Sequence, residues 1–312
     1  MDYIIIDLEW NQCPLGRDLG ERDLPFEIIE IGAVKLDENR QFKGKFHSLI
    51  KPQVYKDIHQ KTWEIIHIDK EELEKGEAFE TVIRDFLAWC GKEYRFGTWG
   101  PMDLIELQRN MEYFGITEVF QKPFFYCDIQ KLFSLETEGH KNPHTLEYAV
   151  DYYEFTQKAE FHRALADAEY TARVFQEISE SIVKRYFSID YYHNPKTKEN
   201  EVYVDYGTYT KFISKEYDSR EAALRDKRIQ KLECHQCGKL IRKRINWFSN
   251  NMKKNYYCIG YCAEHGYMKG RIRVHKTKDG HYFVVKIVSQ TSKEGAKEIQ
   301  ERYRELKKKQ QV

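Results

Sequence analysis

The sequence predicts an α/β domain with helices flanking a mixed five-stranded sheet, followed by a small domain built around cysteine and histidine residues. Three strand-like segments follow one another at the N-terminus, and helix-like and strand-like segments then alternate to about residue 183. Consecutive strands with short turns favour antiparallel pairing, whereas alternation with helices favours parallel neighbours, so one mixed sheet fits both. The spacing of the cysteines after residue 233 is typical of metal binding.

The first three segments read as strands because apolar residues dominate them. The chain opens with a run of three isoleucines, and residues 26–36 and 42–50 form the second and third strands of an antiparallel meander. Residues 78–90 form the first clear amphipathic helix, since their apolar side chains recur at a spacing of three and four.

The following elements alternate between the two types of secondary structure. A short strand at 94–98 is broken by glycine and proline, and a helix begins at Asp103. The last strand and two further helices are expected at 124–129, 145–153 and 164–183.

Four parts are expected along the chain. Residues 1–186 form the α/β domain, and 187–227 form a connecting segment with a hairpin and a helix. Residues 228–290 form a basic domain that is zinc-ribbon-like, and 291–312 form a charged C-terminal helix or tail.

The charge distribution divides the chain into two halves. From residue 228 onward there are 21 basic and 7 acidic residues, a net charge of +14, whereas the preceding part carries −13. This asymmetry favours a nucleic-acid partner for the basic part, although two oppositely charged surfaces that dock on each other remain an alternative. No run of 18 apolar residues and no secretion signal are evident, so we expect a cytoplasmic protein with no membrane association.

Two carboxylates lie at the end of the first strand. Asp7 and Glu9 point to the same face, because side chains alternate along a strand. Two neighbouring carboxylates on a core strand repel each other unless cations neutralise them, so the pair predicts a metal site. An exposed edge strand with two acidic residues is the alternative.

Three further residues complete a pattern with this pair. Asp103 ends the segment 98–103 (TWGPMD), and His162 precedes Asp167 within 162–168 (HRALADA). His162 and Asp167 can converge only if the histidine lies on the incoming loop and the aspartate within the helix. The order of these residues resembles the DEDDh family of 3′→5′ exonucleases over roughly the first 185 residues. The WGxxD form of the second motif is similar to the branch that contains the histone-mRNA and RNAi-type exonucleases and the bacterial KapD proteins.

The resemblance implies an RNase H-like fold and a two-metal-ion mechanism. Two Mg²⁺ or Mn²⁺ ions would be held by the four carboxylates of Asp7, Glu9, Asp103 and Asp167. His162 would act as the general base on the attacking water, and the products would be nucleoside 5′-monophosphates.

The resemblance also implies a substrate and the residues that contact it. The substrate would be single-stranded nucleic acid, with RNA preferred over DNA. Leu8 and Glu9 would contact the terminal nucleotide, and Trp10 and Trp99 could stack on bases or belong to the core.

A second metal site is predicted in the basic part of the chain. Cys234 and Cys237 have the spacing of a zinc knuckle, and Cys262 and His265 form a second half of the same length. These four residues would hold one structural Zn²⁺, with Cys258 as the reserve ligand.

Several functions are compatible with this pattern. A metal-dependent 3′→5′ exonuclease is the leading interpretation. The alternatives are a nucleic-acid-binding adaptor with a vestigial nuclease domain, and a DNA proofreading or repair exonuclease. Cationic and aromatic residues around the cysteines could hold single-stranded nucleic acid through phosphate contacts and stacking.

Overall fold

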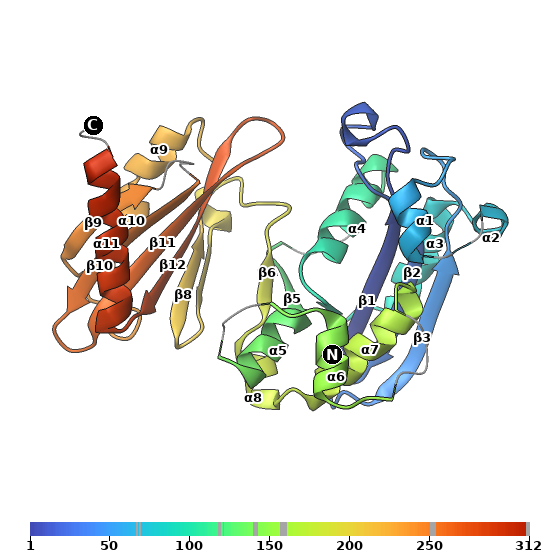
Figure 1. The fold of residues 1–312 in the computed structure, drawn as a ribbon, viewed down its shortest axis with the longest axis horizontal. Coiled ribbons are helices and arrows are strands. Elements are labelled where there is room, and N and C mark those ends of the chain that lie inside the picture. The colour runs from blue at the N-terminus through green and yellow to red at the C-terminus, as the bar shows by residue number, and fades with distance from the viewer. Residues whose placement is uncertain are drawn as a thin grey trace. The chain divides into compact units, whose positions relative to one another are not determined.

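The computed structural model describes residues 1–66, 68, 70–117, 120, 122–139, 143–156, 161–249 and 254–309 (Figure 1). The chain forms two compact units, Met1–Tyr192 and His193–Val312, and each is described by itself. None of the helices in the described parts of the chain combines the length and apolarity that crossing a bilayer requires.

A six-stranded mixed sheet forms the centre of the first unit, with the strand order β3-β2-β1-β4-β5-β6. The strands are β1 (Asp2–Asn11), β2 (Glu27–Leu36), β3 (Phe42–Leu49), β4 (Tyr94–Thr98), β5 (Phe124–Asp128) and β6 (Ser188–Asp190). Strand β1 pairs antiparallel with β2 and parallel with β4. The predicted mixed sheet is therefore confirmed, but the predicted number of five strands is wrong. The short β6 adds an antiparallel edge to β5 and carries too few residues to show a strand periodicity.

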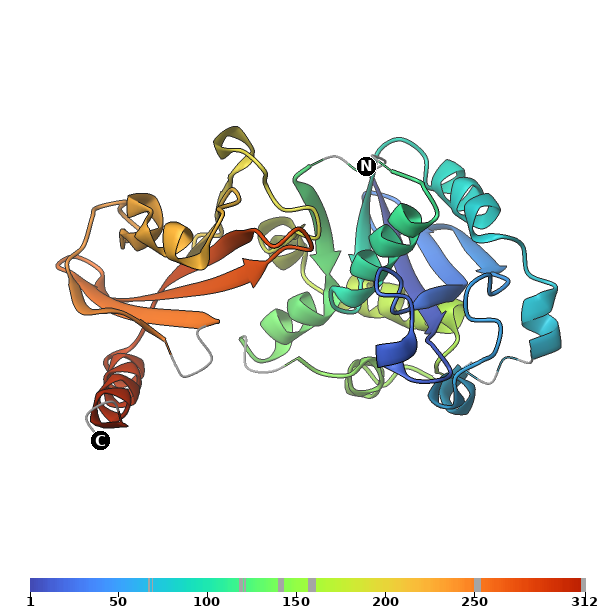
Figure 2. The ribbon, with the colours of Figure 1, turned by 90° about the horizontal axis from the view of Figure 1, so that it is seen from above.

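Helices cover both faces of this sheet (Figures 1 and 2). They are α1 (Gln60–Ile66), α2 (Lys70–Glu74), α3 (Phe79–Cys90), α4 (Met102–Tyr113), α5 (Ile129–Thr137), α6 (Leu146–Tyr152), α7 (Ala164–Glu177) and α8 (Glu180–Arg185). Ile4, Ile6 and Leu8 of β1 form one core cluster with apolar residues of α3 and α4. The alternate residues of β1 face α7, as the contact of 5.0 Å between the ring centroids of Tyr3 and Phe175 indicates.

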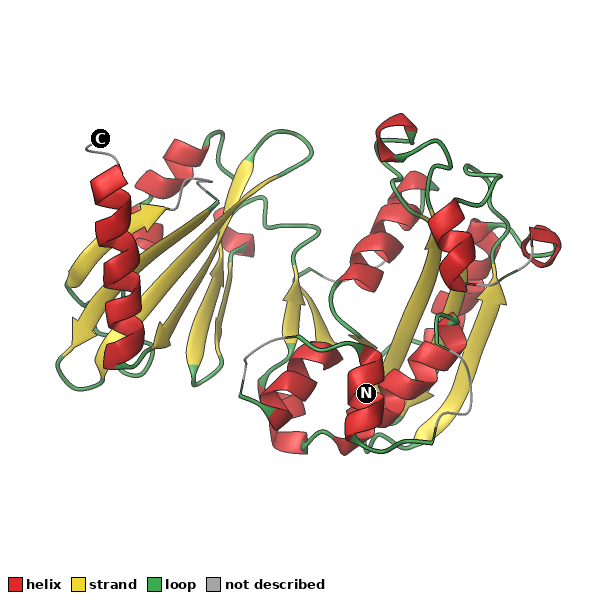
Figure 3. Cartoon of the chain, in the orientation of Figure 1, coloured by secondary structure: helices red, strands yellow, loops and turns green. Residues whose placement is uncertain are grey.

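The second unit contains an antiparallel sheet with the order β7-β8-β12-β11-β10-β9 (Figure 3). Its strands are β7 (Val202–Asp205), β8 (Tyr209–Ile213), β9 (Lys243–Ser249), β10 (Asn255–Cys262), β11 (Gly266–Lys276) and β12 (Tyr282–Gln290). The helices are α9 (Arg220–Arg225), α10 (Lys227–Gln230) and α11 (Lys293–Lys309). Ala296 and Ile299 of α11 pack on Ile245 and Ile259 of the sheet.

The segment 187–227, which we expected to connect two domains, contributes strands to both sheets. Strand β6 joins the first sheet, and the hairpin β7–β8 joins the second through the pairing of β8 with β12. The partner of β8 lies about 75 residues further along the chain. Pairing over that separation leaves no local pattern in the sequence, which explains why the hairpin reads as a linker.

Candidate active site and metal centre

The carboxylates of β1 lie where this strand extends beyond its parallel neighbour. The recorded pairing of β1 with β4 ends at Ile5 and Gly97, two residues before Asp7. On the other side of β1, Asp7 is opposite Gly32 and Glu9 is opposite Glu30. Both carboxylates therefore project from the face that α7 covers.

Helix α4 brings the third carboxylate to this end of the sheet. Asp103 lies in the first turn of α4, is 6% exposed, and accepts a hydrogen bond of 3.1 Å from the backbone N–H of Leu8 through Oδ1. Strand β1 is not paired with β4 at Leu8, so the backbone N–H of Leu8 can donate a hydrogen bond to a side chain. Asp103 thus fixes the start of α4 against the strand segment between Asp7 and Glu9.

Helix α7 and the loop before it provide the remaining two residues. Asp167 lies in the first turn of α7, and its Oδ2 accepts a hydrogen bond of 3.0 Å from the backbone N–H of His162. His162 has a φ of +67°, a conformation that a non-glycine residue rarely adopts and that is frequent at functional sites. One donor atom each from Glu9, His162 and Asp167 lies within 4.8 Å of the others.

These carboxylates strongly disfavour one another's charge. Burial, together with the neighbouring carboxylates of Asp103 and Glu9, raises the pKa of Asp7 well above its usual value. Burial is also the largest cause that raises the pKa of Glu9 to about 8, of Asp103 to about 7 and of Asp167 to about 6. A cluster of this kind needs positive charge to be fully ionised at neutral pH.

The residues of this cluster fit divalent cations. Oδ1 of Asp167 is buried and has no hydrogen-bond partner among the residues that the structure describes. An unpaired buried carboxylate oxygen is costly, and coordination of an ion satisfies it. Carboxylate oxygens are the donors that Mg²⁺ and Mn²⁺ prefer.

A second layer of residues that sequence reasoning missed holds the loop before α7 in place. Glu30 is fully buried and accepts hydrogen bonds from the Arg163 side chain, from the N–H of Ala164 at 3.2 Å, and from His47 at 2.7 Å. Burial raises the pKa of Glu30, but the bonds from His47 and Arg163 outweigh burial and lower it. The available signal in the sequence was an acidic residue within a mostly apolar strand, but the partners of Glu30 lie 17 and 133 residues away.

Gly32 makes the close approach of α7 possible. A Cβ atom at Gly32 would lie 2.1 Å from the backbone carbon of Ala164 and 2.1 Å from the nitrogen of Leu165. Only a residue without a side chain permits this contact, which brings the first turn of α7 next to Asp7.

The expected substrate-contacting residues have different environments. Leu8 is 3% exposed, its side chain belongs to the core, and its backbone N–H is bonded to Asp103. Trp10 packs on the same core and lies 5.7 Å from the ring of Phe26. The indole N–H of Trp99 donates to the backbone oxygen of His144 at 3.1 Å, which fixes the orientation of this half-buried ring.

The second unit brings Cys234, Cys237, Cys262 and His265 together. Their donor atoms lie within 4.8 Å of one another, with 3.5 Å between Cys234 Sγ and His265 Nδ1. Gly238 and Gly266 follow the two halves with φ of +68° and +78°, as tight turns around a metal require. Three thiols and an imidazole are a donor set that Zn²⁺ accepts.

The surroundings of Cys262 favour its thiolate, the form that binds a metal, whereas burial raises the pKa of Cys234. Burial raises the pKa of Cys262, but the hydrogen bonds from His265 and from backbone N–H groups outweigh this effect and lower it to about 6. Cys258, the reserve ligand, lies instead in the core of the sheet, where burial raises its pKa to about 12. The structure thus leaves Cys258 outside the cluster.

Comparison with known proteins places the first unit in a family. The family model of the RNase T type, described as "Exonuclease", matches residues 4–175, more than half of the chain. The nuclease domain of 3′hExo, a DEDDh family member bound to rAMP, is 17% identical with a TM-score of 0.51, covering 61% of this chain and 96% of that chain. A search of curated proteins found no significant match.

Two further solved structures are similar to this chain. A 3′-exonuclease described with the recognition of the histone mRNA stem-loop is 16% identical, with a TM-score of 0.47 and coverage of 56% of this chain and 80% of that chain. E. coli exonuclease I in complex with a dT13 oligonucleotide is 17% identical, with a TM-score of 0.45 and coverage of 56% and 40%.

The cluster of Glu9, His162 and Asp167 beside the mixed sheet, together with the family match, defines a nuclease that hydrolyses phosphodiester bonds. The chain belongs to the exonuclease family, and it is a 3′→5′ exonuclease of the DEDDh type.

Proposed function

We propose that the chain removes nucleotides from the 3′ end of single-stranded RNA and releases nucleoside 5′-monophosphates. The observation that carries this proposal is the convergence of the acidic residues with His162. Glu9 and His162 are more than 150 residues apart in the sequence, yet Glu9, His162 and Asp167 place ligand atoms within 4.8 Å of one another.

The four carboxylates of Asp7, Glu9, Asp103 and Asp167 would hold two Mg²⁺ or Mn²⁺ ions. When bound, such ions activate water and stabilise the charge that develops on the phosphate and on the leaving 3′-oxygen. Helix α7 holds Asp167, and the hydrogen bond between Leu8 and Asp103 orients the third carboxylate.

His162 is proposed as the general base. Its side chain is exposed, whereas its backbone N–H is bonded to Asp167, so the ring is free to reach a water molecule near the carboxylates. Arg163 and Glu30 position the loop that carries it. A well-placed general base contributes roughly 100- to 10,000-fold to a rate.

The preference for RNA rests on the WGxxD form of residues 99–103 and is supported by the neighbour with bound rAMP.

The second unit is proposed to hold a nucleic-acid strand through its positive charge. Arg271 and Arg273 are exposed on one face of β11. Trp247 and Tyr256 are partly buried and pack against the core of this unit.

We also propose one structural Zn²⁺ on Cys234, Cys237, Cys262 and His265, and a location in the reducing cytoplasm. All seven cysteines are free, as a reducing compartment allows.

The proposed function is tested by incubating the full chain and Mg²⁺ or Mn²⁺ with 5′-end-labelled single-stranded RNA, single-stranded DNA and duplexes. We expect stepwise shortening from the 3′ end, fastest on single-stranded RNA, and no shortening by Asp7→Ala. Undiminished activity of purified Asp7→Ala would contradict the proposed site. Binding without shortening by the native chain would favour the adaptor alternative, and a preference for DNA would favour the proofreading or repair alternative.

A further inference from the structure

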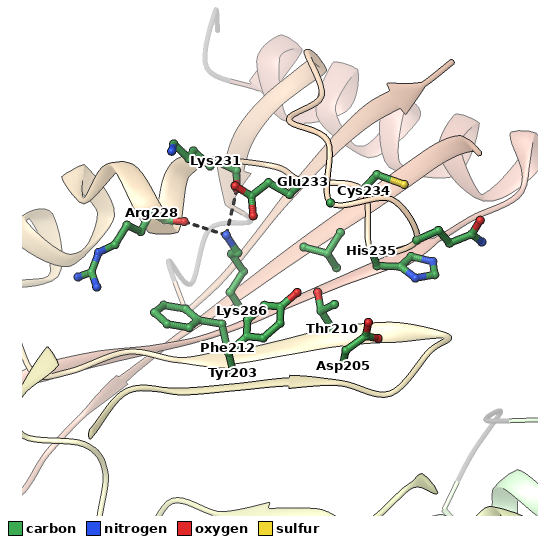
Figure 4. A pocket seen from close by; sticks show the side chains of 13 residues that line it. Tyr203, Asp205, Thr210, Phe212, Arg228, Lys231, Glu233, Cys234, His235 and Lys286 are labelled. Atoms are coloured by element: carbon green, nitrogen blue, oxygen red, sulfur yellow. Dashed lines mark hydrogen bonds between the residues drawn. The ribbon is translucent and has the colours of Figure 1, made fainter. Parts of the chain in front are cut away.

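A pocket of about 370 Å³ opens in the second unit, on the sheet face opposite to the one that α11 covers (Figure 4). The hairpin β7–β8 and strand β12 form its floor, and the segment 231–238 forms its roof. Pockets that bind small ligands have volumes of about 300–1,000 Å³, so the space is large enough for one nucleotide.

The pairing of three strands determines which side chains form the floor of the pocket. Tyr203 lies opposite Phe212, and Asp205 lies opposite Thr210 in the next pair of positions. Side chains two positions apart share a face, so these four side chains point into the pocket together. The neighbouring strand adds Lys286 beside Phe212.

The floor combines aromatic surface with hydrogen-bonding groups. Figure 4 shows Tyr203, Thr210 and Asp205 projecting from the hairpin toward the segment that carries Glu233 and His235. The ammonium group of Lys286 donates to the backbone oxygens of Arg228 and Lys231 at 2.9 and 3.0 Å, which ties the floor to the roof.

The roof contains an imidazole that lacks partners. His235 is 9% exposed, and neither ring nitrogen has a hydrogen-bond partner among the described residues. A buried imidazole without partners is costly, which points to a ligand that supplies them. His235 lies between Cys234 and Cys237, so the cysteine cluster fixes the position of the ring.

The lining of the pocket is mixed in character. The carboxylates of Asp205 and Glu233 lie with the cations of Arg228, Lys231 and Lys286 and with aromatic rings, so a ligand with a flat apolar face and a hydrogen-bonding edge fits better than a simple ion or a wholly apolar molecule.

We propose that this pocket binds one nucleobase that carries an exocyclic amine, from a nucleic-acid strand or a free nucleotide. The aromatic ring of Tyr203 provides a stacking surface, and the carboxylates of Asp205 and Glu233 accept hydrogen bonds from the amine. His235 completes the recognition by bonding to the edge of the base. The inference that a strand supplies the base rests on the proposed function.

The test uses photoaffinity labelling of the full chain carrying Asp7→Asn, which prevents degradation. One probe is 8-azidoadenosine 5′-monophosphate, and the other is a single-stranded RNA with one 8-azidoadenosine. We expect both probes to label peptides within 203–212 or 231–238, as mapped by mass spectrometry. Labelling by the RNA alone would assign the pocket to a strand, and labelling by the mononucleotide alone would assign it to free nucleotides.

Competition and variants test the chemistry. AMP, CMP and GMP should each compete at least fivefold better than UMP, since one well-placed bidentate contact discriminates by about 1–3 kcal/mol. Tyr203→Ala, at a side chain that is 64% exposed, should reduce labelling at least fivefold without unfolding the chain. The matched control is Tyr261→Ala, a 41% exposed tyrosine on β10 that does not line the pocket.

Labelling confined to the exonuclease unit, or equal competition by UMP, would overturn the inference. A native chain that shortens RNA while neither probe labels the pocket would refute this inference alone. Labelling of the pocket in a chain that shortens no nucleic acid would refute the proposed function and leave the binding site standing.

Discussion

The contact between helix α7 and strand β2 can be tested by adding one methyl group at Gly32. A Cβ atom there would lie 2.1 Å from backbone atoms of Ala164 and Leu165, whereas ordinary contact begins at 3.4 Å. The first turn of α7 must therefore withdraw by about 1.3 Å, and Asp167 moves with it. Because a displacement of about 1 Å can lower a rate roughly 100-fold, we expect Gly32→Ala to lower kcat by about that factor.

The same substitution should destabilise the fold, since overpacking of a close contact costs about 1–3 kcal/mol. The control is Gly44→Ala on β3, where a Cβ atom meets no atom within 4 Å. Single-turnover shortening of labelled RNA gives the rate, and urea unfolding gives the free energy. A folded Gly32→Ala protein with the native kcat would refute the inference that this contact positions Asp167 in the acidic cluster.

Three further outcomes are expected. His162→Ala should lower kcat about 100- to 10,000-fold while Mn²⁺ binding, measured by calorimetry, stays unchanged; loss of Mn²⁺ binding would contradict a role as base alone. Without divalent ions, the folded chain binds more protons than the unfolded chain, so its free energy of unfolding in urea should fall as pH rises from about 4 to 8. Added Mg²⁺ should make this fall smaller. A free energy of unfolding that rises with pH would contradict the account. This pH range follows from the raised pKa values of Asp167, Asp103 and Glu9. Cys262→Ser should lose the bound zinc in metal analysis of the full chain, whereas Cys258→Ala should keep it.

The sequence allowed the acidic cluster to be predicted because each member has a local signature. Asp7 and Glu9 share a face by the alternation of a strand, and Asp103 follows a glycine–proline break that starts a helix. The requirement that His162 lie before the helix and Asp167 within it follows from helix geometry, and α7 does begin at Ala164.

The groups that support this cluster have no local signature. Glu30 is one of two acidic residues in a mostly apolar strand, and only the folded chain brings it to Arg163 and His47. From the sequence alone, Gly32 would be expected to destabilise the same strand, since glycine has a low strand propensity. Its role depends on the backbone of Ala164, which is more than 130 residues distant in sequence.

The second unit illustrates the same limit for a binding site. The cysteine spacing is local and identified the four converging residues, but the pocket beside them depends on the register between β7, β8 and β12. In the sequence, Tyr203 and Asp205 are part of a tyrosine-rich run with no evident partner. Pairing with β8 aligns them under His235, which the cysteine cluster holds in place. The cysteine cluster therefore also fixes the segment that forms the roof of this pocket.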